Sequence, residues 1–170
     1  MNERSEGEIK KYREERKITV KGENIPKPVA TFEEARFPKY IQDQLMQTEN
    51  FKDPTIIQSQ GWPVALSGRD MIGIAETGSG KTLAYMLPAI VHVNAQDVLQ
   101  VSPQTHLIPI YQRGDGPIVL VLAPTRELVM QIEQQAKKFA SACKISSLAV
   151  YGGVPRQHQQ YQLEKGKVER

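Results

Sequence analysis

Residues 75–82 read Ala-Glu-Thr-Gly-Ser-Gly-Lys-Thr, and this stretch decides the fold. A short apolar run precedes it at 71–74, and a second apolar stretch follows it at 83–87. The pattern predicts a strand, a glycine-rich turn and a helix, in that order. A loop of this kind at a strand-to-helix junction is typical of proteins that bind nucleoside triphosphates.

Each residue type in the loop has a chemical reason to be there. Gly78 and Gly80 allow backbone N–H groups to approach phosphate oxygens, and the helix N-terminus adds unpaired donors. Lys81 is expected to reach the outer phosphates and the Thr82 hydroxyl to ligate Mg²⁺, so these two are the candidate catalytic residues. The alternative is a glycine-rich loop that binds nothing. The predicted cradle consists of Ala75, which replaces the first glycine of the usual pattern, Thr77, Gly78, Ser79, Gly80, Lys81 and Thr82.

Composition limits the class of protein. A chain of 170 residues favours one domain, and a net charge of +3 permits nucleic acid as a partner without requiring it. The single cysteine, Cys143, excludes a disulfide framework and fits a reducing compartment. No apolar run approaches the ~20 residues of a membrane helix, and the N-terminus lacks the apolar core of a signal peptide. The isolated histidines predict no metal site; they are His92, His106 and His158.

The N-terminal part is predicted to be a charged flank. Residues 5–17 have the composition of a helix with a capping box that begins at Ser5, and few of them are apolar. We therefore expect a solvated helix whose basic residues could touch nucleic acid. The prolines in 24–28 predict a linker. The expected organisation is a flank and linker over 1–29 and a compact domain over 30–170.

The compact domain alternates helical and apolar segments, which predicts an α/β fold with a parallel sheet. Residues 94–117 have no sustained periodicity, and we expect an exposed, irregular excursion there. Strands are expected at 71–75, 118–122 and 148–151. Helices are expected over 33–47, from Thr55 with an interruption at 61–63, from the phosphate loop to about His92, after Glu127, and over 155–165.

Five features occur in one order along the chain: Phe32, the stretch 50–58, the phosphate loop, the stretch 123–128 and the triplet 151–153. Together they resemble the N-terminal RecA-like domain of DEAD-box RNA helicases, and the resemblance covers nearly the whole chain. The stretches 60–70 and 113–117 look like the nuclear subgroup that acts in splicing and transcription. The resemblance implies a partial RecA-like parallel sheet flanked by helices, of the phosphate-loop NTPase type.

The resemblance also implies the nucleotide. Gln58 matches the family glutamine that reads adenine, and a side-chain amide has the donor and acceptor that adenine requires. Phe32 matches the aromatic residue that stacks on the base. The alternatives are a glutamine on a helix surface and an aromatic residue that packs at a helix start. The implied ligands are ATP and Mg²⁺.

RNA is the implied macromolecular partner. Pro124, Thr125 and Arg126 are expected where a strand meets a helix N-terminus, and such a junction can hold RNA phosphates. Gly152 and Gly153 match a family glycine pair at the RNA backbone, although a bare pair would be only a turn. Contacts of this kind give affinity without sequence specificity. The subgroup implies a nuclear protein, with the cytoplasm as a second compartment, and protein partners in ribonucleoprotein complexes, without a membrane.

The sequence departs from the family in several places. The family usually has Gln at Glu76 and Gly at Asn50, and residues 98–112 look like an insertion. We expect the Glu76 carboxylate to point away from the phosphates. The 170 residues do not contain the Asp-Glu-Ala-Asp box. We therefore expect this chain alone to bind nucleotide weakly and to turn over no ATP.

Two functions are compatible with these features. One is an ATP-dependent RNA helicase of which this chain is an N-terminal piece. The other is a non-catalytic ATP- or RNA-binding module that acts by competition with a full-length helicase. An unrelated phosphate-loop kinase would leave Gln58 and the pair Thr125-Arg126 unexplained.

Overall fold

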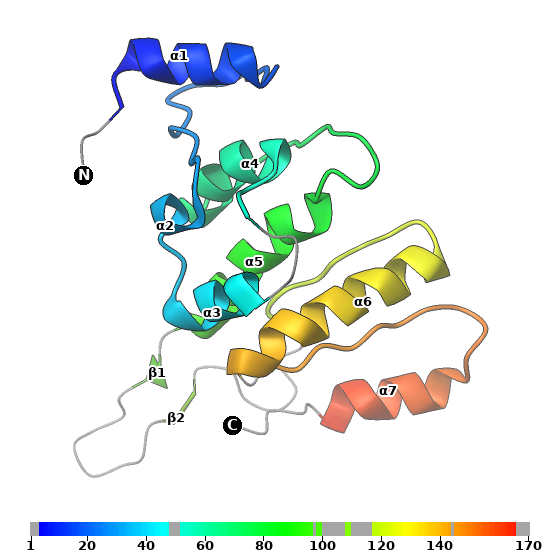
Figure 1. The fold of residues 1–170 in the computed structure, drawn as a ribbon. Helices are drawn as coiled ribbons and strands as arrows, with labels where there is room; N and C mark the ends of the chain where they lie inside the picture. Colours follow the sequence, from blue (N-terminus) through cyan, green and yellow to red (C-terminus); the bar gives the residue numbers. More distant parts are fainter. Residues whose placement is uncertain are drawn as a thin grey trace. The chain divides into compact units, whose positions relative to one another are not determined.

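The computed structural model describes residues 4–47, 52–96, 98–99, 108–109, 117–143 and 145–165 (Figure 1). The chain divides into two compact units, Met1–Pro88 and Ala89–Arg170. Helix α5 begins in the first unit and ends in the second. The helices of the first unit are α1 (Glu6–Glu15), α2 (Phe32–Ala35), α3 (Lys39–Gln47), α4 (Ile56–Leu66) and the start of α5 (Lys81–Asn94).

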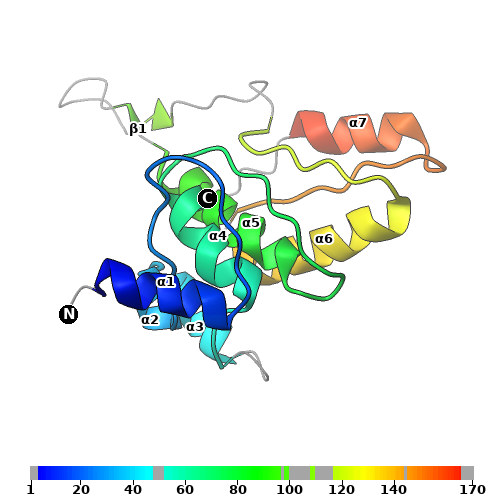
Figure 2. The same cartoon turned by 90° about the horizontal axis from the view of Figure 1, so that it is seen from above.

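Helix α1 is more than a solvated helix. The predicted capping box is present, because the Ser5 backbone N–H donates to Glu8 at 2.7 Å and the Glu8 N–H donates to the Ser5 hydroxyl at 3.4 Å. Ile9 is buried, and the segment that follows α1 passes beside α4 (Figures 1 and 2). Ile9, which precedes the predicted compact domain over 30–170, therefore contributes to the core of the first unit.

Residues 33–47 do not form one helix, and this expectation was wrong. Helix α2 ends at Ala35, where Arg36 adopts a left-handed conformation with φ of 51°. Pro38 disfavours helical geometry for the residue before it, so a new helix begins only at Lys39. The predicted cap at Thr31 is confirmed, since its hydroxyl accepts the Glu34 N–H at 3.3 Å.

The predicted interruption at 61–63 was also wrong, because α4 continues through these residues. Pro63 has no N–H, so the carbonyl of Ser59 loses its partner within the helix. The backbone N–H of Val29 donates to this carbonyl at 2.9 Å instead. A contact from the N-terminal segment thus supports the helix where the sequence alone indicates a break.

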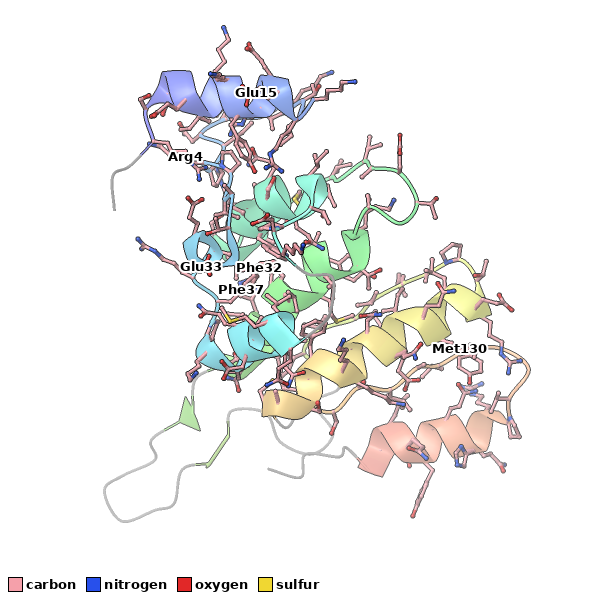
Figure 3. The ribbon with its side chains drawn as sticks, viewed as in Figure 1. Arg4, Glu15, Phe32, Glu33, Phe37 and Met130 are labelled. Carbon is pink, nitrogen blue, oxygen red and sulfur yellow. The ribbon has the colours of Figure 1, made fainter. Side chains whose placement is uncertain are left out.

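An aromatic cluster fills the core of the first unit. The Trp62 ring is fully buried, and its Nε1–H donates to the carbonyl of Leu83 at 3.0 Å. The Phe37 ring meets it edge-on with centroids 4.9 Å apart, and the Phe32 ring lies 6.1 Å away in a tilted orientation (Figure 3). This cluster joins α2, α4 and the start of α5.

The second unit contains α6 (Arg126–Ala140), the short 3₁₀ helix η1 (Ser141–Cys143) and α7 (Arg156–Lys165). Strands β1 (Val98–Leu99) and β2 (Ile108–Pro109) pair antiparallel. They fall in the predicted irregular excursion, most of which lies outside the described residues. The helical spacing of Leu128, Ile132, Ala136 and Phe139 predicts an apolar face on α6. The last three of these residues are buried together with Ala140, whereas Leu128 is 37% exposed.

The three runs expected to be strands form no ladder within the described part of the chain, and the parallel sheet is not observed there. Ile72 and Ile74 are each 92% exposed, and Leu122 is 84% exposed. An apolar run indicates a preference for burial, but parallel pairing requires neighbours from distant parts of the sequence. Among residues 148–151, helix side chains bind the backbone instead: Glu133 accepts the Ala149 N–H at 3.1 Å.

Candidate functional site

The phosphate loop has the geometry that its glycines predict. Gly78 and Gly80 have φ values of 77° and 87°, which strongly favour glycine. A Cβ atom at Gly80 would also lie 2.5 Å from Nε2 of Gln58 and 3.0 Å from the Thr55 hydroxyl oxygen, whereas a Cβ atom at Gly78 would meet nothing within 4 Å. Gly80 is therefore required both for its backbone conformation and for the close approach of α4.

Lys81 is the first residue of α5, and its side chain lies across the loop. Its ammonium donates to the carbonyl of Ala75 and, at 2.6 Å, to the carbonyl of Glu76. The Glu76 side chain is exposed. A phosphate group would compete with these two carbonyls for the ammonium, and it carries more charge than they do.

Gln58 is fully buried and joins the N-terminus of α4 to the loop. Its Oε1 accepts the Thr55 N–H at 3.1 Å, and its Nε2 donates to the Gly80 carbonyl at 3.1 Å. The amide has one further N–H and one further lone pair. The reading of adenine by Gln58 stays a prediction, and these two remaining positions are the ones that could perform it.

The buried hydroxyl oxygen of Ser79 in the loop has no hydrogen-bond partner. Buried polar groups are usually satisfied, so this hydroxyl fits a ligand that carries oxygen or nitrogen acceptors. The Thr82 hydroxyl bonds with Tyr85, whose pKa is raised by burial and lowered to a smaller extent by this bond. The residues present therefore fit a triphosphate, and Thr82 is the one that would hold Mg²⁺.

Phe32, the residue expected to stack on the base, is buried in the aromatic cluster. It is 5% exposed and its ring lies 6.1 Å from that of Trp62, so its stacking on a base stays a prediction (Figure 3).

Within the described residues, no group of three or more His, Cys, Asp or Glu side chains could hold a metal ion. None of the helices in those ranges has the length and apolar composition that spanning a bilayer requires.

In the second unit, the structure brings together the two stretches predicted to contact RNA. The Arg126 guanidinium lies over the Tyr151 ring, 4.8 Å from its centroid. A Cβ atom at Gly153 would lie 3.6 Å from Nη1 of Arg126, and Gly153 has φ of 82°. Arg126 and the glycine turn are therefore neighbours at the surface, and Pro124 and Gly152 are exposed as well.

Thr125 has a structural role at this surface. Its hydroxyl accepts the Leu128 N–H at 3.3 Å and caps α6. The cap fixes the start of the helix from which Arg126 projects. A contact from Thr125 to an RNA phosphate stays a prediction. It would have to come from the Thr125 backbone, or from the hydroxyl donating its proton while it still accepts the Leu128 N–H.

Sequence reasoning missed Gln159, which holds the glycine turn from α7. Its Oε1 accepts the Tyr151 N–H at 2.9 Å, and its Nε2 donates to the carbonyls of Tyr151 and Val154 at 3.1 and 3.3 Å. One amide thus binds the backbone on both sides of Gly152 and Gly153. Nothing in the pattern of the glutamine-rich stretch distinguished this glutamine from its neighbours.

The profile of the DEAD/DEAH box helicase family matches residues 55–169. The chain belongs to this family. The family membership accounts for the order of the phosphate loop and the later motifs. It also confirms the resemblance that the sequence indicated.

Several helicases of known name are similar to the chain. "DEAD-box ATP-dependent RNA helicase 20" of Oryza sativa subsp. japonica is 56% identical over 162 residues, which cover 95% of this chain and 30% of that protein. "ATP-dependent RNA helicase DBP2" of Chaetomium thermophilum is 53% identical, over 96% of this chain and 27% of that protein. The chain therefore spans less than a third of the length of these curated relatives.

Solved helicase structures share the fold. The RNA helicase Prp28 from Chaetomium thermophilum, solved bound to ADP, matches with a TM-score of 0.80 and 36% identity, over 96% of this chain and 37% of that one. Yeast Prp28, a DEAD-box splicing factor, matches with a TM-score of 0.76 and 29% identity, over the same shares of the two chains. The fold of this chain is thus that of part of a DEAD-box helicase.

Proposed function

We propose that the chain is the nucleotide-binding N-terminal part of an ATP-dependent RNA helicase. The observation that carries the proposal is the loop at 75–82. It lies at the N-terminus of α5, has two glycines at positive φ, and includes the Lys81 ammonium and the unpartnered Ser79 hydroxyl. A similar structure, that of Prp28 from Chaetomium thermophilum, was solved with ADP bound, which supports a nucleotide as the ligand.

In this proposal the loop binds and orients the triphosphate. The N–H groups at the start of α5 and the Lys81 ammonium hold phosphate oxygens, and Thr82 contributes a hydroxyl to Mg²⁺, which would offset phosphate charge. Gln58 holds Gly80 and offers its remaining N–H and lone pair to adenine. Phe32 is the proposed stacking residue.

The proposal assigns RNA to the second unit. The Arg126 guanidinium and the N–H groups of the turn at Gly152 and Gly153 would bind phosphate oxygens. Such contacts support binding without sequence specificity. We also propose that a parallel RecA-like sheet forms when further strands are present. The proposed location is the nucleus, and the proposed protein partners belong to ribonucleoprotein complexes.

Hydrolysis requires more than this chain provides. It needs a carboxylate that holds the metal, a residue that orients water, and positive charge at the transition state. Lys81 and Thr82 supply only part of this set. The 170-residue chain is therefore expected to bind nucleotide without turning it over, which is also the behaviour of the alternative, a non-catalytic binding module.

Nucleotide binding by the 170-residue chain tests the proposal. A fluorescent ADP analogue should bind in the presence of Mg²⁺, and Lys81→Ala should weaken binding by roughly tenfold or more, as expected for loss of a charge-assisted contact. Equal affinity of the two proteins would overturn the assignment of the loop. RNA-stimulated phosphate release by the 170-residue chain, abolished in Lys81→Ala, would contradict the expectation of no turnover.

A further inference from the structure

Helix α4 is held on two opposite sides by hydrogen bonds from its side chains. Gln58 bonds with Gly80 of the phosphate loop. Gln60 accepts the Arg13 Nε–H at 3.0 Å and donates to the Pro26 carbonyl at 2.9 Å. Residues two positions apart on a helix point about 200° apart, so the two glutamines face opposite ways. The N-terminal segment therefore contacts the face of α4 that lies opposite the loop.

A backbone contact reinforces this support. Pro63 leaves the Ser59 carbonyl without its helical partner, and the Val29 N–H donates to it at 2.9 Å. Ser59 is fully buried and lies between Gln58 and Gln60. Three successive residues of α4 are thus tied either to the phosphate loop or to the N-terminal segment.

The N-terminal segment is itself anchored at several points. Arg13 donates through Nη2 to the Pro26 carbonyl at 3.1 Å, and the Tyr12 hydroxyl donates to the Val29 carbonyl at 3.3 Å. Arg69, beyond the end of α4, donates to the carbonyls of Glu23 and Asn24. Arg4 pairs with Glu34, whose carboxylate also accepts the Ala30 N–H.

We propose that the N-terminal segment braces the nucleotide site through two residues. Arg13 and Val29 bind the side of α4 that lies opposite the phosphate loop, and this fixes the Gln58 amide against Gly80. Arg13 is then a positioning residue that acts through Gln60 and α4. The proposal rests on the proposed nucleotide binding at the loop. It assigns a function to a segment that the sequence predicted to be a solvated flank.

The charges on α1 favour this role over RNA binding. Lys10 and Lys11 each lie within 4 Å of a glutamate one turn later, at 3.9 and 3.8 Å. The exposed face of the helix therefore has mixed charge. Arg13, by contrast, directs its guanidinium to Gln60 and Pro26 inside the unit.

The test compares two identical changes on neighbouring turns. Arg13→Met keeps the apolar length of the side chain and removes its N–H donors. Arg16→Met is the matched control. The Arg16 guanidinium stacks on the Tyr12 ring, 4.7 Å from its centroid, where a methionine side chain can still pack, whereas the bonds to Gln60 and Pro26 come from Arg13. Affinity for the fluorescent ADP analogue with Mg²⁺ is measured in the 170-residue chain for both variants, and circular dichroism reports their helix content.

Arg13→Met should weaken nucleotide binding by roughly threefold or more, a typical size for a change that acts through a neighbouring element, while Arg16→Met leaves it unchanged. Arg13→Lys, which keeps a positively charged donor group in place of the planar guanidinium, should restore part of the affinity. The single variant Gln60→Ala and the double variant Arg13→Met/Gln60→Ala complete the test. The double variant should bind nucleotide about as well as the weaker-binding of the two single variants, because both changes break the same hydrogen bond between Arg13 and Gln60.

The outcomes separate the brace from the nucleotide site. If Lys81→Ala binds as well as the wild-type chain, the proposed function fails. If Lys81→Ala loses binding while Arg13→Met and Arg16→Met bind alike, the brace alone is wrong. If Arg13→Met loses helix content, the comparison is made with Arg13→Lys and Arg16→Lys, and equal affinities of that pair likewise overturn the brace.

Discussion

Gly80 shows how one residue can be required for two separate reasons. Its positive φ would strain any residue with a side chain, and a Cβ atom would collide with the Gln58 amide. Gly78 has only the first constraint. The sequence motif predicts a glycine at both positions without distinguishing them. They differ because Gln58 at the start of α4 lies against Gly80 and not against Gly78.

The two glycines therefore predict different outcomes for the same substitution. Gly78→Ala and Gly80→Ala should each cost about 1–2 kcal/mol of stability through left-handed strain. Gly80→Ala should in addition displace Gln58 and reduce nucleotide affinity well below that of Gly78→Ala. Urea denaturation and nucleotide titration of both variants check this, and equal losses of affinity would contradict the contact with Gln58.

Cys143 should react slowly in the folded chain. Burial raises the pKa of its thiol, an effect that hydrogen bonds from the backbone offset only in part, and its Sγ lies 3.4 Å from the Ala140 carbonyl. Alkylation requires the thiolate, so at pH 8 the rate should be lower in the native chain than in urea and should rise as the pH increases. Because the chain has one cysteine, mass spectrometry reads the rate directly. Equal rates in the native and unfolded chains would contradict the burial.

Among the elements, helix starts that have a side-chain cap were predictable from the sequence. The separate start of α3 at Lys39 and the continuity of α4 were not. Ser5, Thr31 and Thr125 each cap a helix by a bond to a backbone N–H a few residues away, which is a local pattern. The continuation of α4 through Pro63 depends on Val29, far away in the sequence. Local propensity cannot include a partner of that kind.

The cap at Thr125 supports a prediction about α6. Thr125→Ala removes the acceptor for the Leu128 N–H and should cost about 1 kcal/mol of stability. Thr125→Ser keeps the hydroxyl and should cost much less. Urea denaturation measures both variants, and a loss in Thr125→Ser as large as that in Thr125→Ala would show that the methyl group, rather than the cap, matters.

At the scale of the whole molecule, the exposed apolar runs are the main departure from expectation. The sequence correctly indicated the family and the loop, because these depend on short motifs in a fixed order. It predicted strands at 71–75, 118–122 and 148–151, where the described residues form no strand. Strand pairing depends on neighbours that are remote in the chain, and apolar composition does not specify them.

These runs predict that the isolated chain associates with itself. Leu122 is 84% exposed in an apolar run that pairs with no strand in the described residues, and exposed apolar runs associate readily with other chains. Leu122→Thr should lower the amount of associated species severalfold, as seen by light scattering over a range of concentrations. Leu163→Thr is the control, since Leu163 is 50% exposed but lies within α7. An equal effect of both changes would mean that general surface hydrophobicity controls association.

The bond from Val29 to the Ser59 carbonyl has a consequence for which sequences this position can tolerate. The contact uses the backbone of residue 29, so many side chains can make it, and proline alone lacks the required N–H. In a library that varies position 29, proline should therefore be depleted far more than substitutions of similar size. A proline in the helix at position 63 thus excludes a proline at position 29. Residue choice at the two positions should therefore covary among related sequences.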